Sequence, residues 1–457
     1  MLIFVPTFGF MNITTNGVAL GPAAVPSWIL VCLLYFLPLT AIIAELASAN
    51  KEKSGGIYSW VACSLGDRWA FFGTWSYFIS NLFYLQVVFA RIPVMVSWAL
   101  FGENRFNDEN VALLPYYSIL LCLALTWIAT RGVKTFSKLS NVGGKLTFMS
   151  TGLFILFAFV AYFKGTPSAT EWTAEAVMPD FSTSYFATLS WLLFAVAGAE
   201  VAGTYIKKVK NPVRTFPRGV LIATLVIGLS YVIGSIAVGL VASHEVLANA
   251  GIKDGVYVVH VLLAESLGIN GQVVVRIFAA ILVVTSIAAY VVWIESPIRA
   301  MFAAVPEHTF PKFLTTRDES DSFSNALWTQ AGVVTILIAI PLVGLSSIDS
   351  FFRLLTDLSA LSLAIPYIIL AAAFLVFRIR GSRGPFSMLR SKTLAISVAG
   401  MTLLIGVAGF FGAGLDYIVI AETGREATQA ILMTYGGPFV LIVLGYGLTY
   451  YNRRVSS

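Results

Sequence analysis

Long apolar runs separated by short polar and charged stretches repeat along the whole 457-residue chain. Each run approaches the length of about 17–25 residues that an α-helix needs to cross the hydrocarbon core of a bilayer. The pattern predicts twelve transmembrane helices, at residues 1–19, 27–48, 69–101, 112–130, 145–165, 183–206, 217–242, 273–300, 326–343, 348–377, 393–413 and 431–451. We therefore predict an all-α membrane protein with about 12 transmembrane helices.

The first predicted helix starts in an unusual way. It begins at Met1 with no basic residue before it, and only about 13 Å of helix precedes Gly9 at a rise of 1.5 Å per residue. Either the native chain begins further upstream, or this helix enters the membrane unusually short. The opening residues also lack the basic region and the small-residue cleavage site of a secretory signal.

Composition supports the membrane assignment. Apolar residues make up 58% of the chain and charged residues 11%, whereas soluble domains carry about 25% charged residues. The net charge of +6 does not indicate a nucleic-acid partner, because the basic residues alternate between loops instead of forming one patch. The partners we expect are the lipid bilayer and a small substrate, and we expect Cys32, Cys63 and Cys122 to be unpaired packing residues.

Lysine and arginine are concentrated in alternate loops, and the loops of this set hold most of the 29 basic residues. Cytoplasmic loops carry the excess of basic residues in membrane proteins. The C-terminal end belongs to the basic set, which places it in the cytoplasm. Because the twelve predicted spans are even in number, we predict that the N-terminus is cytoplasmic as well. This topology is that of a multi-pass protein of the cytoplasmic (inner) membrane.

Two of the predicted helices are interrupted by glycine and polar residues. The first reads "VPTFGFMNITTNG" and the sixth reads "FAVAGAEVAG", five spans apart. Paired interruptions in corresponding halves of a chain are typical of inverted-repeat transporters with a binding site near the bilayer midplane. Exposed N–H groups at such a break attract a carboxylate, and freed carbonyls attract an ammonium group. Together they suit a zwitterion such as an amino acid.

Three stretches resemble one known family. "GGIYSWVACSLGDRWAF" (Gly55–Phe71), "FAVAGAE…KNPVRTFP" (Phe194–Pro217) and "WIESPIRAMF" (Trp293–Phe302) are similar to motifs of the amino acid–polyamine–organocation (APC) superfamily, particularly its bacterial glutamate:GABA antiporter branch. The resemblance implies a five-plus-five inverted repeat with broken first and sixth helices that works by alternating access. The implied parts are residues 1–165, residues 183–377 and two further helices at 393–451.

The resemblance also implies where a substrate binds in the first helix. The family's unwound motif aligns with Thr7, Phe8 and Gly9, of which only the glycine matches the family's residue. The implied contact with the substrate carboxylate is therefore best supported at Gly9.

In the sixth helix, the implied unwinding falls at Ala197 and Gly198, and an aromatic lid over the substrate aligns with Phe194. The family's sixth-helix carboxylate aligns with Glu200, which the resemblance implies to be proton-sensitive. The residue type agrees, because an ionisable side chain inside a membrane span is costly and indicates function. A structural alternative is that Glu200 pairs with a buried base or binds a backbone group.

Two basic residues have a functional and a structural interpretation. Arg91, in the third span, could pair with the side chain of an acidic substrate, or with Glu200 or Asp357, or extend toward the outer surface. Lys145 resembles the fifth-helix lysine of some family members, which replaces a sodium ion, bridges the first and eighth helices and carries the coupling proton. Its structural alternative is a lysine at a helix end that reaches lipid phosphates.

Other polar residues inside spans favour structural roles. Arg353 and Asp357 lie four residues apart and favour an ion pair, with an external gate as the alternative. Glu295 and its partner four residues on, Arg299, favour an internal ion pair. Tyr77, with Asn81 and Gln86, gives the third span a polar side that either lines the site or forms hydrogen bonds between helices.

The residues together predict a secondary active amino acid transporter, in which an amino acid is exchanged for a related amino acid or amine in a pH-sensitive way. One alternative is proton-coupled symport through Lys145, and a remote alternative is a transporter-like receptor. The sequence has no nucleophile–base arrangement or metal-ligand spacing, so we expect no enzyme activity, no metal and no cofactor. We expect a monomer or homodimer.

Overall fold

The computed structural model describes residues 7–52, 56–106, 109–110, 112–131, 133–201, 209–302, 309–319, 321–339, 348–419, 421, 423–436, 438–440 and 442–447. These residues form helices joined by turns, with no strand among them. Four predicted spans begin or end in segments outside the described residues, at 1–6, 202–208, 340–347 and 448–457. The all-α prediction is confirmed over the part of the chain that can be followed.

Most of the predicted spans correspond to long helices. The main helices of the structure are α2 (Phe10–Leu20), α3 (Ala24–Val31), α4 (Leu37–Ala49), α6 (Asp67–Phe101), α8 (Val133–Phe163), α10 (Thr183–Ala195), α11 (Pro212–Val241), α12 (His244–Ser266), α13 (Gly271–Phe302), α16 (Ile348–Ile379) and α17 (Lys392–Gly412). Within the described ranges, nine helices are long and apolar enough to cross a membrane, counting Phe10–Ala49 as one. The shorter apolar helices Leu113–Ala129, Ser324–Ala339 and Thr434–Gly447 match the fourth, ninth and twelfth predicted spans.

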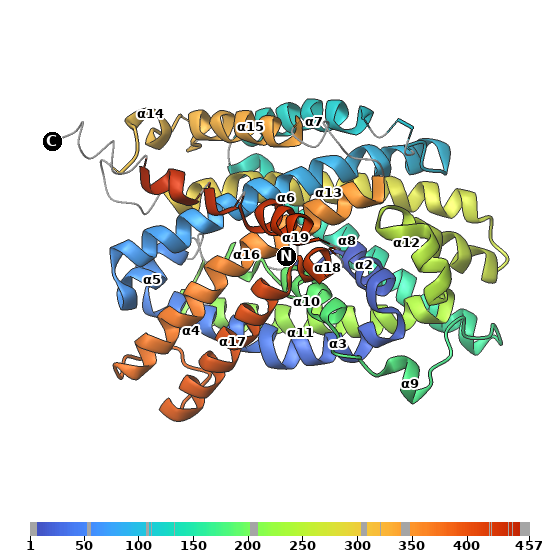
Figure 1. Ribbon diagram of the computed structural model, residues 1–457, viewed down its shortest axis with the longest axis horizontal. Coiled ribbons are helices and arrows are strands. Elements are labelled where there is room, and N and C mark those ends of the chain that lie inside the picture. The colour runs from blue at the N-terminus through green and yellow to red at the C-terminus, as the bar shows by residue number, and fades with distance from the viewer. Residues whose placement is uncertain are drawn as a thin grey trace.

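Helix α12 was not among the predicted spans. Its charged and polar residues, including Lys253 and Asp254, interrupt the apolar run that marks a span. The helix is also kinked at Gly251, where φ is 69°, a value that glycine adopts without steric cost. It packs mainly against α2 and α13 at one end of the molecule (Figure 1).

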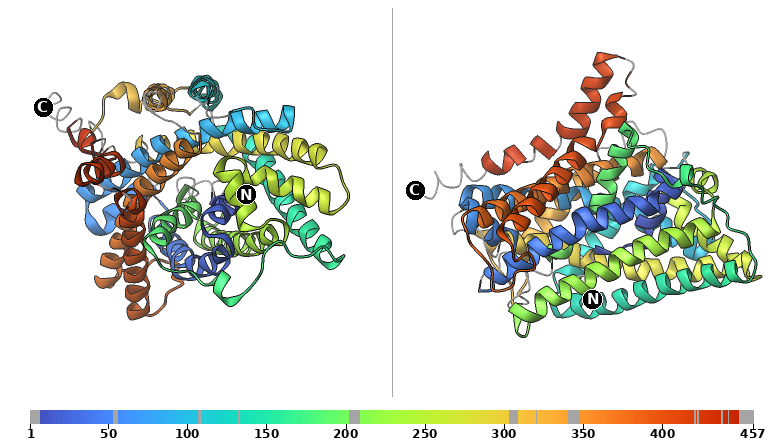
Figure 2. Two further views of the ribbon diagram at one scale, coloured as in Figure 1. Left: turned by 45° about the vertical axis from the view of Figure 1, so that its right-hand side comes forward. Right: turned by 90° about the horizontal axis from the view of Figure 1, so that it is seen from below.

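Helix α6 lies at the centre of the helical packing. It packs against α13 and α16, and 83% of its most apolar stretch is buried, compared with 22% for residues 141–163 of α8. Helices α7 (Leu113–Ala129) and α15 (Ser324–Ala339) lie side by side along the outside of this layer (Figures 1 and 2). Because a helix buried on all sides belongs to the core, α6 can contribute side chains to an internal site.

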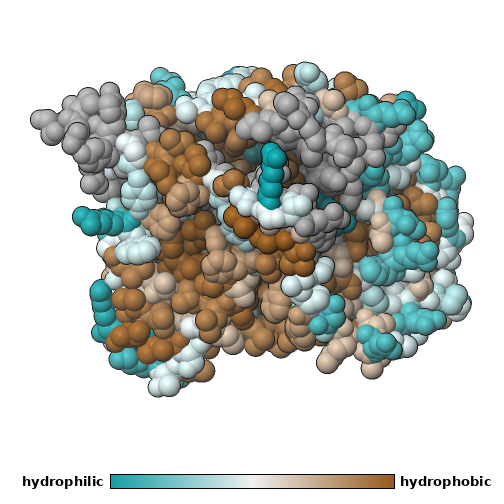
Figure 3. All heavy atoms as spheres, in the orientation of Figure 1, coloured by the Kyte–Doolittle hydropathy of each residue, from teal (hydrophilic) through white to brown (hydrophobic). Residues whose placement is uncertain are grey.

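The outer surface has the polarity expected of a membrane protein. Figure 3 shows apolar residues over much of the centre and lower left of one face, with hydrophilic residues gathered toward its right-hand edge. Large apolar side chains such as Leu225, Leu229 and Leu404 are exposed. An exposed apolar surface of this extent is stable when lipid covers it.

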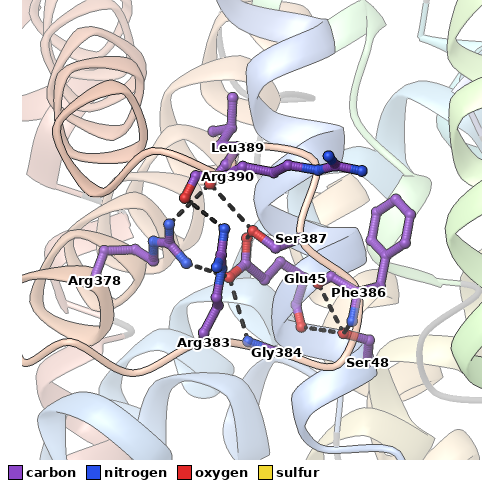
Figure 4. Close-up of polar contacts among 9 residues, drawn as sticks. All are labelled: Glu45, Ser48, Arg378, Arg383, Gly384, Phe386, Ser387, Leu389 and Arg390. Carbon is purple, nitrogen blue, oxygen red and sulfur yellow. Dashed lines mark hydrogen bonds and ion pairs between the residues drawn. The ribbon is translucent and has the colours of Figure 1, made fainter.

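A buried ion pair attaches the loop between α16 and α17 to the end of α4 (Figure 4). Nη1 of Arg378 donates to Oε1 of Glu45 at 2.9 Å, and these side chains are only 4% and 1% exposed. Ser387 Oγ and the Gly384 N–H donate to the same carboxylate at 2.8 and 3.3 Å. Nη2 of Arg378 donates to the Leu389 carbonyl at 2.8 Å. The carboxylate therefore holds α4, α16 and the loop together.

Candidate functional site

The predicted break in the first helix is present. Phe8 and Gly9 are not helical, and α2 begins at Phe10 with Gly9 in an extended conformation (φ −139°, ψ 123°). The N–H groups of the first turn of α2 point back toward this break, because a helix leaves its first amides without intrahelical partners. The break thus provides hydrogen-bond donors and the positive end of a helix dipole.

The predicted break in the sixth helix is also present. Helix α10 ends at Ala195, Gly198 has a φ of 121°, and a single helical turn follows at residues 199–201. A positive φ favours glycine, which accounts for the residue at this position. The course of the predicted span beyond Val201 lies outside the described residues.

A cavity of about 130 Å³ lies between the two breaks. It is lined by the start of α2 and by side chains from α6, α8, α10, α13 and α16. Six of the residues predicted to bind substrate line it, namely Thr7, Phe8, Gly9, Phe194, Ala197 and Arg91. Segments that are far apart in the sequence therefore meet at one cavity.

The other two residues predicted to bind substrate, Tyr77 and Gly198, contact Glu200. The Tyr77 hydroxyl donates to Oε1 at 3.0 Å, and the Gly198 N–H donates to Oε2 at 3.1 Å. The Tyr367 hydroxyl also accepts a hydrogen bond from Gly198 N–H at 3.1 Å. Glu200 is 2% exposed and forms no ion pair within the described ranges. Its carboxylate holds the backbone of the break to α6, which agrees with the structural alternative.

Aromatic rings form one wall of the cavity. The Tyr84 ring lies 5.4 Å from Phe194 and 5.1 Å from Trp293, both in edge-on arrangements. Neither Tyr84 nor Trp293 was predicted to line the site. A signal was available, because Tyr77, Tyr84 and Arg91 follow each other at intervals of seven and so lie on one face of α6.

Arg91 is a cation that lines the cavity. Among the described residues it forms no ion pair, and its electrostatic neighbours are Tyr84, Tyr257 and Tyr290. The two carboxylates that could have paired with it are engaged elsewhere. Glu200 accepts from Tyr77, and Asp357 accepts from Trp191 Nε1 at 2.6 Å.

Several buried polar atoms that line the cavity lack partners. Thr7 Oγ1, Thr15 Oγ1, Asn16 Oδ1 and both amide atoms of Asn81 have no hydrogen bond within the part of the chain that the structure covers. Buried polar atoms are nearly always hydrogen-bonded, so these atoms indicate a polar ligand or ordered water. The Asn81 amide makes no interhelical hydrogen bond, the alternative proposed for it, with any residue that the structure describes.

The remaining predicted residues lie apart from the cavity. Lys145 on α8 is exposed and does not line the cavity, to which α8 contributes Thr147 and Ser150. Its role in coupling stays a prediction, as does an ion pair between Arg353 and Asp357.

The predicted ion pair between Arg299 and Glu295 is confirmed, at 2.6 Å, and Arg299 also contacts Asp321 at 3.4 Å. Over the ranges that the structure describes, no group of three His, Cys, Asp or Glu residues could hold a metal ion.

Comparisons with known proteins identify the family and several relatives of this chain. A family model described as amino acid permease matches residues 1–444. The chain is 28% identical over 465 aligned residues to the aspartate/glutamate permease AcaP of Lactococcus lactis subsp. cremoris, covering 99% of this chain and 94% of the relative. It is 27% identical over 486 residues to the inner membrane transporter YjeM of Escherichia coli, covering 99% and 95%. It is 23% identical over 411 residues to a glutamate/gamma-aminobutyrate antiporter of Lactococcus lactis subsp. lactis, covering 88% and 80%.

Proposed function

Since this chain belongs to the amino acid permease family, we propose that it exchanges an acidic amino acid for a related amino acid or amine across the cytoplasmic membrane. The observation that carries the proposal is the cavity between the two helix breaks, lined by Arg91, a cation that forms no ion pair with the residues that the structure describes. Two interrupted helices that meet at an internal cavity are typical of inverted-repeat transporters that work by alternating access. The proposed topology has both termini in the cytoplasm and two inverted repeats, at residues 1–165 and 183–377.

The two breaks supply the groups that a zwitterion needs. The amides at the start of α2 bind the substrate's α-carboxylate, and the carbonyls released at the breaks bind its ammonium group. Phe194, together with Tyr84, closes over the bound molecule. Because these contacts involve only the backbone part of an amino acid, they do not select among side chains.

Arg91 supplies the selectivity for an acidic side chain. A guanidinium in a site of low polarity binds a carboxylate through charge-assisted hydrogen bonds, in which two N–H groups can act together. Two relatives, at 28% and 23% identity, carry the names aspartate/glutamate permease and glutamate/gamma-aminobutyrate antiporter. These names support an acidic substrate for this chain.

Glu200 makes the exchange sensitive to pH. Protonation of its carboxylate removes one of the two acceptors that hold Tyr77 and Gly198, which loosens the contact between α6 and the second break. Proton-coupled symport, with Lys145 carrying the proton, and a receptor role are the competing functions.

The test is uptake of labelled amino acids into proteoliposomes that are empty, preloaded with glutamate, or placed under a proton gradient. The panel contains aspartate, glutamate, γ-aminobutyrate and a neutral amino acid. Uptake of glutamate or aspartate into preloaded vesicles but not empty ones supports acidic amino acid exchange. Uptake into empty vesicles that requires only the proton gradient supports symport instead. Absence of amino acid movement under all three conditions contradicts transport, and binding without movement supports a receptor.

A further inference from the structure

A single tyrosine hydroxyl joins the two interrupted helices. Tyr231 lies on α11, fully buried, and its ring stacks on the indole of Trp28 at 4.1 Å with an interplanar angle of 3°. The Phe8 ring lies 5.0 Å away on the side of the first break. One turn further along α11, a Cβ on Gly234 would lie 2.5 Å from Ile13, so α11 packs closely against α2 here. This packing fixes the position of the Tyr231 oxygen.

That oxygen lies within hydrogen-bonding distance of four groups. On the first-helix side these are the Gly9 N–H at 3.4 Å, Asn12 Nδ2 at 3.2 Å and the Thr7 carbonyl at 3.2 Å. On the sixth-helix side it is the Ala195 carbonyl at 2.8 Å, at the last residue of α10. Two of the groups are donors and two are acceptors, and all lie at or beside the breaks.

The hydroxyl cannot satisfy all four groups at once. A phenol has two lone pairs, which can accept from Gly9 and Asn12, but it has only one proton to donate. Because the distance to the Ala195 carbonyl is the shorter of the two, the hydroxyl donates its hydrogen bond to Ala195 in this conformation. The Thr7 carbonyl then receives no hydrogen bond from Tyr231. Thr7 lines the cavity, so its carbonyl can then accept a hydrogen bond from a substrate ammonium group.

We propose that Tyr231 is the positioning residue that couples the two interrupted helices during exchange. Rotation about its C–O bond moves the proton between the carbonyls of Ala195 and Thr7. When a substrate ammonium group binds the carbonyl at one break, the Tyr231 hydroxyl donates to the carbonyl at the other break. Substrate binding at one break therefore favours one conformation of both breaks. This inference rests on the proposed transport function and extends it to a residue behind the cavity wall.

The test compares Tyr231→Phe with Tyr435→Phe. The control is matched, because the Tyr435 hydroxyl also contacts two carbonyls, those of Phe411 and Ala413 at 3.2 and 2.8 Å, away from the cavity. The assay measures glutamate exchange in preloaded proteoliposomes, with KM, the glutamate Kd in detergent and the Tm of each protein. We expect Tyr231→Phe to lower the maximal exchange rate about tenfold and to change Kd by less than about threefold. Tyr435→Phe is expected to exchange at the wild-type rate.

Each other outcome has a separate meaning. A Tyr231→Phe protein that exchanges at the wild-type rate overturns the inference. Equal losses of rate, affinity and Tm also overturn it, since they identify a purely structural hydroxyl. If wild type and Tyr435→Phe are both inactive, the proposed transport function itself fails.

A second variant serves if Tyr231→Phe does not fold. Genetically encoded 3-fluorotyrosine at position 231 keeps the shape and the hydroxyl but makes it a stronger donor. We expect it to slow exchange at least about threefold with an unchanged Kd. An unchanged rate in this protein overturns the inference.

Discussion

The Tyr77 hydroxyl donates to Oε1 of Glu200 across 3.0 Å, and this contact joins the central helix α6 to the second helix break. The other carboxylate oxygen accepts from the Gly198 N–H, so one side chain connects a rigid helix to the non-helical backbone beside it. An ionised carboxylate accepts both hydrogen bonds, whereas the neutral acid has a proton on one oxygen and accepts less well there. The contact between α6 and the break therefore depends on the ionisation of one group.

Substitution of Glu200 by glutamine should abolish the pH dependence of exchange. In the wild type, acid weakens the contact between Glu200 and its donors, which include Tyr77 and Gly198. We therefore expect exchange to rise at least about threefold between about pH 7.5 and about pH 5.5. The glutamine side chain has one acceptor oxygen at every pH, so Glu200→Gln should show a ratio near one. A variant that retains the wild-type pH profile would show that Glu200 is not the pH-sensitive group.

Substitution of Arg91 by glutamine should impair binding of acidic substrates selectively. A hydrogen bond to a charged group contributes about 1.5–3 kcal/mol, so KM for glutamate should rise about ten- to a hundredfold. Exchange of a neutral amino acid should change by less than about threefold. The matched control is Arg276→Gln, which removes an exposed guanidinium that donates to the Phe101 carbonyl at 2.9 Å. Equal effects of Arg91→Gln on acidic and neutral substrates would contradict the assigned role.

Loss of one partner of the buried pair between Glu45 and Arg378 should destabilise the protein strongly. Glu45→Gln leaves the Arg378 charge buried without a counterion, at a cost of about 3 kcal/mol or more. The exposed pair between Glu103 and Arg105, at 3.4 Å, provides the control, because such pairs contribute about 1 kcal/mol or less. Thermal unfolding in detergent should therefore show a large decrease in Tm for Glu45→Gln and a small one for Glu103→Gln. Similar Tm values for the two variants would contradict this reading of the buried pair.

Asp321 should make stability depend on pH in the acidic range. Partial burial raises the pKa of its carboxyl group, but the hydrogen bond from Arg317 and the charge of Arg299 outweigh burial, so the pKa lies below its ordinary value of 3.8. A lowered pKa in the folded state stabilises the protein above the unfolded-state value, and this contribution is lost as pH falls through the folded-state pKa.

The corresponding experiment compares the Tm of wild type and Asp321→Asn. The variant should melt at a lower temperature at neutral pH, by a small amount because the carboxylate is half exposed. The difference should shrink as the pH falls below 3.8. A difference that is constant with pH would show that the charge of Asp321 does not contribute.

The features that the sequence predicted correctly are those that depend on neighbouring residues. Apolar length is a local property, so the helices were found, and glycine within an apolar run identified both breaks, at Gly9 and Gly198. Helix α12 was missed because polar and charged residues interrupt its apolar run. Its apolar face becomes recognisable only from its packing against α2 and α13. The pair between Glu295 and Arg299 was predicted because residues four apart on a helix are neighbours.

The parts of the site that were missed depend on how distant helices are rotated. Tyr84 could have been found from its interval of seven residues to Arg91, but Trp293 is on another helix whose orientation the sequence does not specify. Tyr231 gave no signal, because a tyrosine in an apolar run has the same appearance whether its hydroxyl meets one group or four. Glu45 and Arg378 likewise could not be paired from sequence, since Glu45 lies within the predicted span 27–48, Arg378 follows the span 348–377, and no spacing links the two.

The ion pair between Glu45 and Arg378 also has a consequence for biosynthesis. The two residues are separated by 333 positions, and a ribosome adds residues at about 5–20 per second. Glu45 is therefore made tens of seconds before its counterion, and Ser387 and Gly384, which share its carboxylate, come later still. The end of α4 therefore cannot complete these contacts until the chain has been made as far as Ser387, long after α4 itself has been synthesised.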